Sequence, residues 1–282
     1  MPDKDHYDPP VVLTIAGFDP SGGAGVIADV HTIQSFGCTA VAAITSITFQ
    51  NTAKYFGAVH QPADVVRKQI EAVVLDYRIR AVKIGMLPTA EMISQIAWLI
   101  GELSLPSPVI DPVMESTSGG RLMADDDAFE LFVAELLPLS RLVTPNIPEA
   151  EKLAGMNIRD EDEMRQAAAR IRELGARAVL IKGGHLGTQA SRLLQSSSEG
   201  AGGTPAYPSE AIDLLDDQGE VRRFRGDWIE APPVRGTGCK LSSAIAACLA
   251  KGMSLAQSVS AAKTFVAAEI QNSTPKNLKS EI

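Results

Sequence analysis

The sequence predicts an α/β fold in which a mostly parallel central sheet carries helices on both faces. Short runs rich in β-branched and apolar residues alternate with longer stretches whose apolar residues recur at helical spacing, which is typical of βαβ units. At 211–229 this alternation stops. Two strand-like runs there flank the turn Asp217-Gln218-Gly219, and they predict an antiparallel hairpin at one edge of the sheet.

The first half of the chain begins with a buried strand. VVLTIAG at 11–17 is a continuous apolar run, and a glycine loop separates it from a helix with Val26, Ile33 and Phe36 at helical spacing. The following apolar runs predict strands, and the amphipathic stretches between them predict helices. The expected elements are a strand at 39–48, a helix at 62–77, a strand at 81–86, a helix at 89–103 with Thr89 as N-cap, and a strand at 108–114.

The second half repeats the pattern before the hairpin. The expected elements are a helix at 125–137, a strand at 141–146, a short helix at 147–155, a helix at 160–175 with acids in its first turn, and a strand at 178–184. After the hairpin, helices are expected at about 237–250 and 254–271. No linker divides the chain, so we expect a single domain over 1–282, with an N-terminal tail at 1–10 and a surface insertion at 189–209.

Composition excludes several functional classes. Of 282 residues, 45% are hydrophobic and 21% are charged, as in ordinary globular proteins, and the net charge of −8 argues against a nucleic-acid or membrane-surface protein. Three cysteines without a CxxC pair predict neither a disulfide framework nor a zinc site. The polar start MPDKDHYDPP is no signal peptide, and no apolar run reaches the roughly 18 residues that span a bilayer. We therefore expect a cytoplasmic protein.

The segment VRGTGCK places a glycine-rich turn directly before an apolar helix. Gly236, Thr237, Gly238 and Cys239 then lie at the helix start, where the first N–H groups have no internal partner and the dipole is positive. This arrangement predicts a site for a phosphate or for a phosphoryl group in transfer. The same field is expected to lower the pKa of Cys239, so that its thiolate can take a proton from a hydroxyl. The alternative is that Cys239 only fills space and the glycines only cap.

A second glycine loop, AGFDPSGGAG at 16–25, joins the first strand to the first helix. It contains the loose dinucleotide pattern G-x-G-x-x-A, but the second strand ends in SITFQNT, without the acid that would hold a ribose. No P-loop sequence occurs. We expect the loop to line a small-molecule pocket, with Asp19 or Asp29 available to bind a polar ring, although either acid can equally belong to a helix start or the surface.

Polar side chains follow several other strands of the predicted sheet. Asn146 and Glu149 are three residues apart across a helix start, so both can face one hydrated Mg²⁺, which prefers few carboxylates together with waters and phosphate oxygens. The alternative is a simple helix cap by Asn146. Lys182 ends a buried strand, where a cation is costly unless it faces an anion.

These pieces together resemble a known family. The matching stretches are TIAGFDPSGGAGVIADV, FQNT, KIGMLP, VIDPVM, TPNIPEAE, LIKGGHL and RGTGCKLSSAIAA, in this order from residue 11 to about residue 270. They resemble the hydroxymethylpyrimidine and phosphomethylpyrimidine kinases of thiamine biosynthesis, within the ribokinase-like superfamily. The resemblance implies a ribokinase-like three-layer αβα sandwich and a homodimer.

The same resemblance implies an enzyme that uses ATP and Mg²⁺ to phosphorylate 4-amino-5-hydroxymethyl-2-methylpyrimidine and then its monophosphate. Carried over by position, the pyrimidine pocket comprises Gly17, Asp29, Gln50, Met86 and Val113. The magnesium site comprises Asn146 and Glu149 with Asp111, and the nucleotide contacts are Lys182, Arg235 and Asn146. The anion hole comprises Gly236, Thr237 and Gly238, with Lys182 nearby, and Cys239 stands where most of the superfamily carries an aspartate base.

The chain departs from the family pattern beside the anion hole. Arg235 replaces a usual histidine and Lys240 a usual threonine, and both cations are expected to strengthen nucleotide contacts. A pyridoxal or pyridoxine kinase is therefore kept as an alternative, although Gln50 and His185 favour the pyrimidine kinase. A non-catalytic ligand-binding protein with this fold is a second alternative, opposed by the retained GTGC, Lys182 and N-x-x-E.

Overall fold

The computed structural model describes residues 9–51, 54–114, 122–123, 126–184, 210–227 and 235–273. The predicted insertion at 189–209, most of the predicted tail and His185 lie outside these residues. No helix in the described ranges combines the length and the apolar character needed to cross a bilayer.

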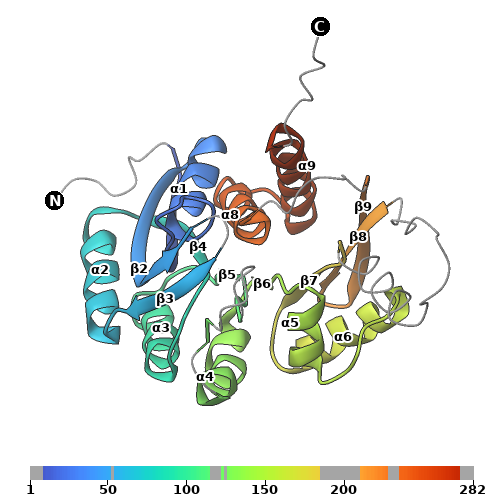
Figure 1. Ribbon diagram of the computed structural model, residues 1–282, viewed down its shortest axis with the longest axis horizontal. Coiled ribbons are helices and arrows are strands. Elements are labelled where there is room, and N and C mark those ends of the chain that lie inside the picture. The colour runs from blue at the N-terminus through green and yellow to red at the C-terminus, as the bar shows by residue number, and fades with distance from the viewer. Residues whose placement is uncertain are drawn as a thin grey trace, which may run out of the picture.

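The strands of the described residues form one nine-stranded sheet (Figure 1). They are β1 (Val11–Phe18), β2 (Thr39–Gln50), β3 (Tyr55–His60), β4 (Ile79–Ile84), β5 (Val109–Ile110), β6 (Leu142–Val143), β7 (Ala178–Lys182), β8 (Glu210–Asp217) and β9 (Glu220–Asp227). Their spatial order is β3-β2-β1-β4-β5-β6-β7-β8-β9. Neighbours from β2 to β7 pair in parallel, whereas β3, β8 and β9 pair antiparallel. The predicted parallel sheet with an antiparallel edge hairpin is confirmed.

Helices cover both faces of this sheet (Figure 1). They are α1 (Gly25–Ser35), α2 (Ala63–Asp76), α3 (Ala90–Glu102), α4 (Asp126–Leu131), α5 (Ile147–Ala154), α6 (Glu161–Glu173), α8 (Thr237–Ala250) and α9 (Leu255–Ser273). The helix predicted at 125–137 is only partly α-helical. It continues beyond α4 as a π-helical turn (Phe132–Leu136) and a 3-10 turn (Leu137–Leu139), whose Pro138 lacks the N–H that an α-helical bond requires.

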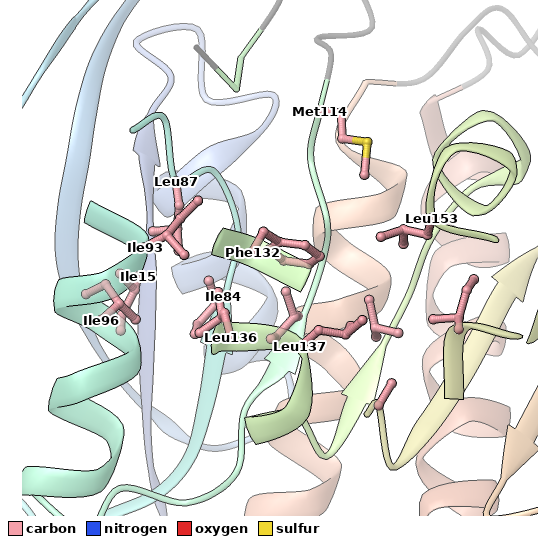
Figure 2. Close-up of a cluster of buried hydrophobic side chains, with 14 of the residues drawn as sticks. Ile15, Ile84, Leu87, Ile93, Ile96, Met114, Phe132, Leu136, Leu137 and Leu153 are labelled. Carbon is pink, nitrogen blue, oxygen red and sulfur yellow. The ribbon is translucent and has the colours of Figure 1, made fainter. Parts of the chain in front are cut away.

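Two separate hydrophobic cores form because consecutive strand residues point to opposite faces. On β4, Val82 packs with α2 to α6, whereas its neighbour Ala81 packs with α1, α8 and α9. Val143 and Leu142 on β6 divide in the same way. Figure 2 shows the first core, where Ile15 and Ile84 of the sheet lie near Ile96 of α3. Fully burying each such side chain contributes about 1.5–3 kcal/mol, and the two cores hold the sheet between two helical layers.

β3 differs from the prediction by being present, and β5 and β6 are shorter than predicted. β3 was not predicted because Gly57 interrupts YFGAVH and its apolar and polar residues do not alternate with a period of two. The runs at 108–114 and 141–146 leave the sheet after two residues, shortly before Pro112 and Pro145, which cannot donate a ladder hydrogen bond. The polar residues that follow these two short strands therefore lie in loops at one edge of the sheet.

Candidate active site

A cavity of about 910 Å³ opens at the edge of the sheet where the parallel strands end. One part of its wall comes from the loops after β1, β4, β5 and β6, together with the end of β2. The start of α8 forms the middle of the wall, and β8, β9 and α9 form the opposite part. Ligands of open α/β sheets bind at this edge, so the position agrees with the prediction from the polar strand ends.

The start of α8 presents free backbone N–H groups to this cavity. Gly236 is the N-cap in a left-handed conformation with φ of 72°, and no side chain caps the helix. The first helical hydrogen bond runs from Lys240 N to Gly236 O at 2.9 Å. Thr237, Gly238 and Cys239 precede it and line the cavity, so their N–H groups have no acceptor within the helix. With the positive end of the dipole of a 14-residue helix, they form a candidate anion site.

The two glycine turns of the sequence pack directly against each other. A Cβ on Gly236 would lie 2.0 Å from the carbonyl oxygen of Gly23, which is far inside any van der Waals contact. A Cβ on Gly25, where φ is 60°, would lie 2.2 Å from the carbonyl oxygen of Gly17. Only glycine fits at both positions, because each combines a left-handed backbone with contact to another backbone.

Asp19 organises the first of these turns. Its Oδ1 accepts hydrogen bonds from Ser21 N at 2.9 Å and from Ser21 Oγ at 2.7 Å, and its Oδ2 accepts one from Ala24 N at 3.0 Å. Both carboxylate oxygens are thus bound within their own loop. Asp19 shapes the backbone that Gly236 contacts. This agrees with the helix-start alternative that the sequence left open for Asp19, which also lines the cavity.

Asp111 and Lys182 form a largely buried ion pair beside Gly238. Lys182 Nζ lies 2.9 Å from Asp111 Oδ1, and a Cβ on Gly238 would lie 3.1 Å from Lys182 Nζ. Burial would raise the pKa of Asp111, but Lys182 and Lys83 hold it below its ordinary value. Burial would lower the pKa of Lys182, but Asp111 and Glu149 raise it. Both groups are therefore charged at neutral pH, next to the start of α8.

Asn146 and Glu149 cap each other at the start of α5. Glu149 N donates to Asn146 Oδ1 at 2.9 Å, and Asn146 N donates to Glu149 Oε2 at 2.8 Å, which makes a capping box. Burial and the nearby Asp111 carboxylate raise the pKa of Glu149 to about 7, although Lys182 opposes the shift. The helix cap that the sequence left as an alternative is therefore present. The raised pKa of Glu149 also shows that the cations around this buried carboxyl group do not fully stabilise its ionised form.

These carboxylates fit a hydrated Mg²⁺. In the described part of the chain, no three His, Cys, Asp or Glu side chains are arranged to hold a metal ion. Asp111 and Glu149 are two buried oxygen donors that repel each other electrostatically and lie in the wall of one cavity. Mg²⁺ commonly binds through one or two carboxylates, with waters and phosphate oxygens completing its shell.

The expected low pKa of Cys239 is wrong for the unliganded protein. Burial raises the pKa of Cys239 to about 12, and the carboxylates of Asp111 and Asp29 add to the shift. Lys83 and a hydrogen bond from the Gly25 backbone oppose it. The helix start still presents its N–H groups, but the loss of water around the sulfur outweighs its field.

Asp29 is the second correction. It was predicted in the pyrimidine pocket, yet its side chain is fully buried behind the cavity wall. Its Oδ2 accepts from Lys83 Nζ at 2.8 Å and from Thr14 Oγ1 at 2.6 Å, and its Oδ1 accepts from Ser243 Oγ at 2.8 Å. Asp29 therefore fixes Lys83, and it is Lys83 that lines the cavity.

Lys83 is a site residue that the sequence analysis missed. It lies in β4 with no exposed surface. Burial would lower its pKa, but Asp29, Cys239 and Asp111 raise it, so Lys83 stays a cation that interacts electrostatically with Cys239. The signal was present in AVKIGM, where a lysine interrupts an apolar strand, because a charge in such a position needs a buried partner.

The predicted substrate end comes together around Met86. Gly17, Gln50, Met86 and Val113 all line the cavity, and a Cβ on Gly17 would lie 3.1 Å from Met86 Sδ. The side chain of Arg235, predicted to contact the nucleotide, instead reaches Gln50 and Asn51 at the substrate end. Its Nη2 donates to Gln50 Oε1 at 2.5 Å, and its Nη1 donates to the carbonyl oxygen of Asn51.

The opposite end of the cavity was not predicted. It is lined by Phe224, Arg225, Gly226, Lys263, Val266 and Ile270 from β9 and α9. Lys263 joins α9 to the hairpin, because its Nζ donates to the Phe224 carbonyl of β9 at 3.1 Å and to Asp213 Oδ2 of β8 at 2.6 Å. Asp213 Oδ1 also accepts from Gly183 N, just after β7, at 2.9 Å. No sequence motif marks these residues. Lys240, also expected to be near the nucleotide, pairs with Glu269 at 2.6 Å.

The chain is similar to known proteins over nearly its whole length. The family model described as Phosphomethylpyrimidine kinase matches residues 19–281. A hydroxymethylpyrimidine/phosphomethylpyrimidine kinase of Streptomyces coelicolor is 38% identical over 267 residues, which cover 95% of this chain and 91% of that protein. The thiamine biosynthesis bifunctional protein ThiED of Geobacter sulfurreducens is 39% identical over 264 residues, which cover 94% of this chain and half of that protein.

Solved structures agree with these relatives. Phosphomethylpyrimidine kinase (thiD) from Clostridium difficile is 36% identical with a TM-score of 0.75, covering 93% of this chain and 99% of that one. The pyridoxal kinase from Staphylococcus aureus in complex with AMP-PCP and pyridoxal is 31% identical with a TM-score of 0.79, covering 93% and 88%. The ribokinase-like fold and the phosphotransferase class predicted from the sequence are confirmed, and the chain belongs to the phosphomethylpyrimidine kinase family.

Proposed function

We propose that this kinase transfers the γ-phosphoryl group of ATP to the hydroxymethyl group of 4-amino-5-hydroxymethyl-2-methylpyrimidine, and then phosphorylates the monophosphate. The observation that carries the proposal is the uncapped start of α8, whose Thr237, Gly238 and Cys239 N–H groups face the cavity between its two ends. Phosphoryl transfer depends mainly on positioning and on charge stabilisation, and a rigid set of backbone donors provides both.

The cavity divides into parts that suit the two substrates. The pyrimidine is assigned to the end with Gly17, Gln50, Met86 and Val113, where an apolar thioether and one polar amide can contact a small ring. The nucleotide is assigned to the end formed by β9 and α9, where Phe224, Val266 and Ile270 supply apolar surface. The reacting groups then meet at α8.

In the first reaction, the substrate oxygen forms a bond to the γ-phosphorus as the bond from that phosphorus to the bridging oxygen of ADP breaks. We assign Cys239 as the group that receives the hydroxyl proton, since it lines the cavity at the start of α8. Because burial raises its pKa to about 12, the thiol must lose its own proton before it can act, and the nearby Lys83 cation favours that loss. Lys182, held by Asp111, places a fixed cation near the transferred charge. A positioned base typically contributes 10²–10⁴-fold to a rate.

Mg²⁺ is the proposed metal, bound by Asp111 and Glu149 and, through water, by Asn146. The ion neutralises phosphate charge when bound. The protein holds Glu149 in place through its cap with Asn146, and it holds Asp111 through Lys182 and the Thr144 hydroxyl at 3.4 Å.

The test is an ADP-release assay with the pyrimidine alcohol, its monophosphate and pyridoxal side by side. We expect ATP consumption with both pyrimidines, and no turnover with either would overturn the proposal. Pyridoxal is included because the similar Staphylococcus aureus enzyme is a pyridoxal kinase. Preference for pyridoxal by kcat/KM would favour that second function.

A homodimer is also proposed. Ile47 and Phe49 of β2 and Val59 of β3 lie on one face of the strand pair, and their exposed fractions are 43%, 49% and 53%. A second copy of the chain would cover this apolar face. Sedimentation of wild type and Phe49→Glu checks this, since a wild-type monomer contradicts it. The single-domain organisation and the cytoplasmic location stay predictions.

A further inference from the structure

We propose that Arg235 binds the phosphate carried by the monophosphate substrate, and so selects the substrate of the second phosphorylation. This inference rests on the proposed function and deepens it. It replaces the nucleotide contact that the sequence predicted for Arg235.

Arg235 crosses from the anion site to the pyrimidine end of the cavity. Its backbone directly precedes Gly236, and its guanidinium reaches Gln50 Oε1 and the Asn51 carbonyl at the end of β2. Arg235, Gly236 and Gln50 all line the cavity. A ring bound at Gln50 with its hydroxymethyl group directed to α8 would place a phosphate on that group within the span that Arg235 crosses.

Among the described residues, no carboxylate neutralises the charge of Arg235. Both acceptors of its guanidinium are uncharged oxygens, and within the described ranges no carboxylate pairs with it. Its Nε is buried and lacks a hydrogen-bond partner among the described residues. A cation that lines a cavity and faces no carboxylate among the described residues favours an anionic ligand. Arginine suits phosphate because its planar guanidinium can donate several hydrogen bonds at once.

The contact with Gln50 gives a way to distinguish phosphate binding by Arg235 from a purely structural role of this residue. A guanidinium only donates hydrogen bonds, so the Gln50 atom facing it must be the amide oxygen. Arg235 thereby orients the Gln50 amide for any substrate that contacts it, phosphorylated or not. Loss of this orientation affects the alcohol and the monophosphate equally, whereas loss of a phosphate contact affects the monophosphate alone.

The experiment compares wild type with Arg235→Gln and Arg235→Lys, and with Arg222→Gln as a control at an exposed arginine of β9 that does not line the cavity. Steady-state rates at saturating ATP give kcat and KM for the alcohol and for the monophosphate. We expect the ratio of kcat/KM, monophosphate over alcohol, to fall about 10–100-fold in Arg235→Gln, mainly through KM. Arg235→Lys should recover part of the ratio because it keeps the charge, and Arg222→Gln should leave it unchanged.

Equilibrium binding of the pyrimidine monophosphate without ATP is the second measurement. Wild type should bind it more weakly as salt increases, and Arg235→Gln should bind it 10–100-fold more weakly with less dependence on salt. An equal loss for both substrates, a change confined to the KM for ATP, or unchanged monophosphate binding would each overturn the inference. If wild type turned over neither substrate, the proposed function would fail, and binding would still decide the role of Arg235.

Discussion

Replacing Gly236 by alanine tests whether the contact between the two glycine turns positions the anion site. The new Cβ would lie 2.0 Å from Gly23 O, whereas ordinary contact begins near 3.4 Å, so the backbones must separate by about 1.4 Å. Neither atom belongs to a flexible side chain, so the start of α8 or the turn at Gly23 must move, and either movement separates the two turns that form the site. Misplacement of reacting groups by about 1 Å can cost on the order of 10²-fold in rate. We therefore expect kcat to fall at least 100-fold.

Gly252→Ala is the matched control. Gly252 follows α8 at its other end, also has a positive φ, 83°, and has nothing within 4 Å of its added Cβ. Both variants carry the left-handed strain of about 1–2 kcal/mol, which corresponds to a few degrees in Tm. Only Gly236→Ala adds the backbone clash.

The assay is ADP release with the pyrimidine alcohol, with Tm measured on the same preparations. Gly252→Ala should lose a few degrees in Tm and keep its kcat. If Gly236→Ala kept kcat within threefold of wild type while folded, or if both variants lost activity equally, the interlocked turns would not position the site.

Three further results are expected. Lys83→Met leaves the Asp29 carboxylate buried without a cation, so the free energy of unfolding in urea should fall by about 3–5 kcal/mol. The control Lys68→Met breaks an exposed ion pair on α2 and should lower the free energy of unfolding by less than about 1 kcal/mol. Equal losses in the two variants would contradict the argument from the buried pair. Because the pKa of Glu149 in the folded protein, about 7, exceeds its ordinary value of 4.5, its contribution to stability is present below pH 4.5 and is lost as pH rises through 7. Between pH 5 and pH 8, the free energy of unfolding should therefore decrease more for wild type than for Glu149→Gln. Parallel pH profiles of the two proteins would refute the shift. Cys239→Ala should lower kcat by about 10²–10⁴-fold with little change in the KM for ATP. The control Cys248→Ala removes a buried cysteine of the same helix and should retain kcat. Full activity of Cys239→Ala would exclude Cys239 as the base.

Local features of the site could be predicted from the sequence. Strand ends in a parallel sheet share an edge, so the convergence of Asp111, Asn146 and Lys182 follows from the order of elements alone. The uncapped glycine start of α8 was predicted because cap chemistry is local, and its residue range, 237–250, agrees with the structure.

Burial and side-chain direction could not be predicted in this way. The pKa of Cys239 depends on how much water the whole fold removes from its sulfur. Asp29 lies on the face of α1 that packs against β1 and α8, so its side chain contacts Lys83 rather than the cavity. Arg235 turns to Gln50, a residue distant in sequence, and nothing in the local segment RGTGCK indicates that partner.

The proposed phosphoryl-transfer site joins segments that are far apart in the polypeptide. The turn after β1 is synthesised well before α8, yet each is shaped by contact with the other. A nascent chain on the ribosome therefore carries no working catalyst until α8 has emerged. Truncation before α8 should abolish phosphate recognition outright rather than weaken it by degrees.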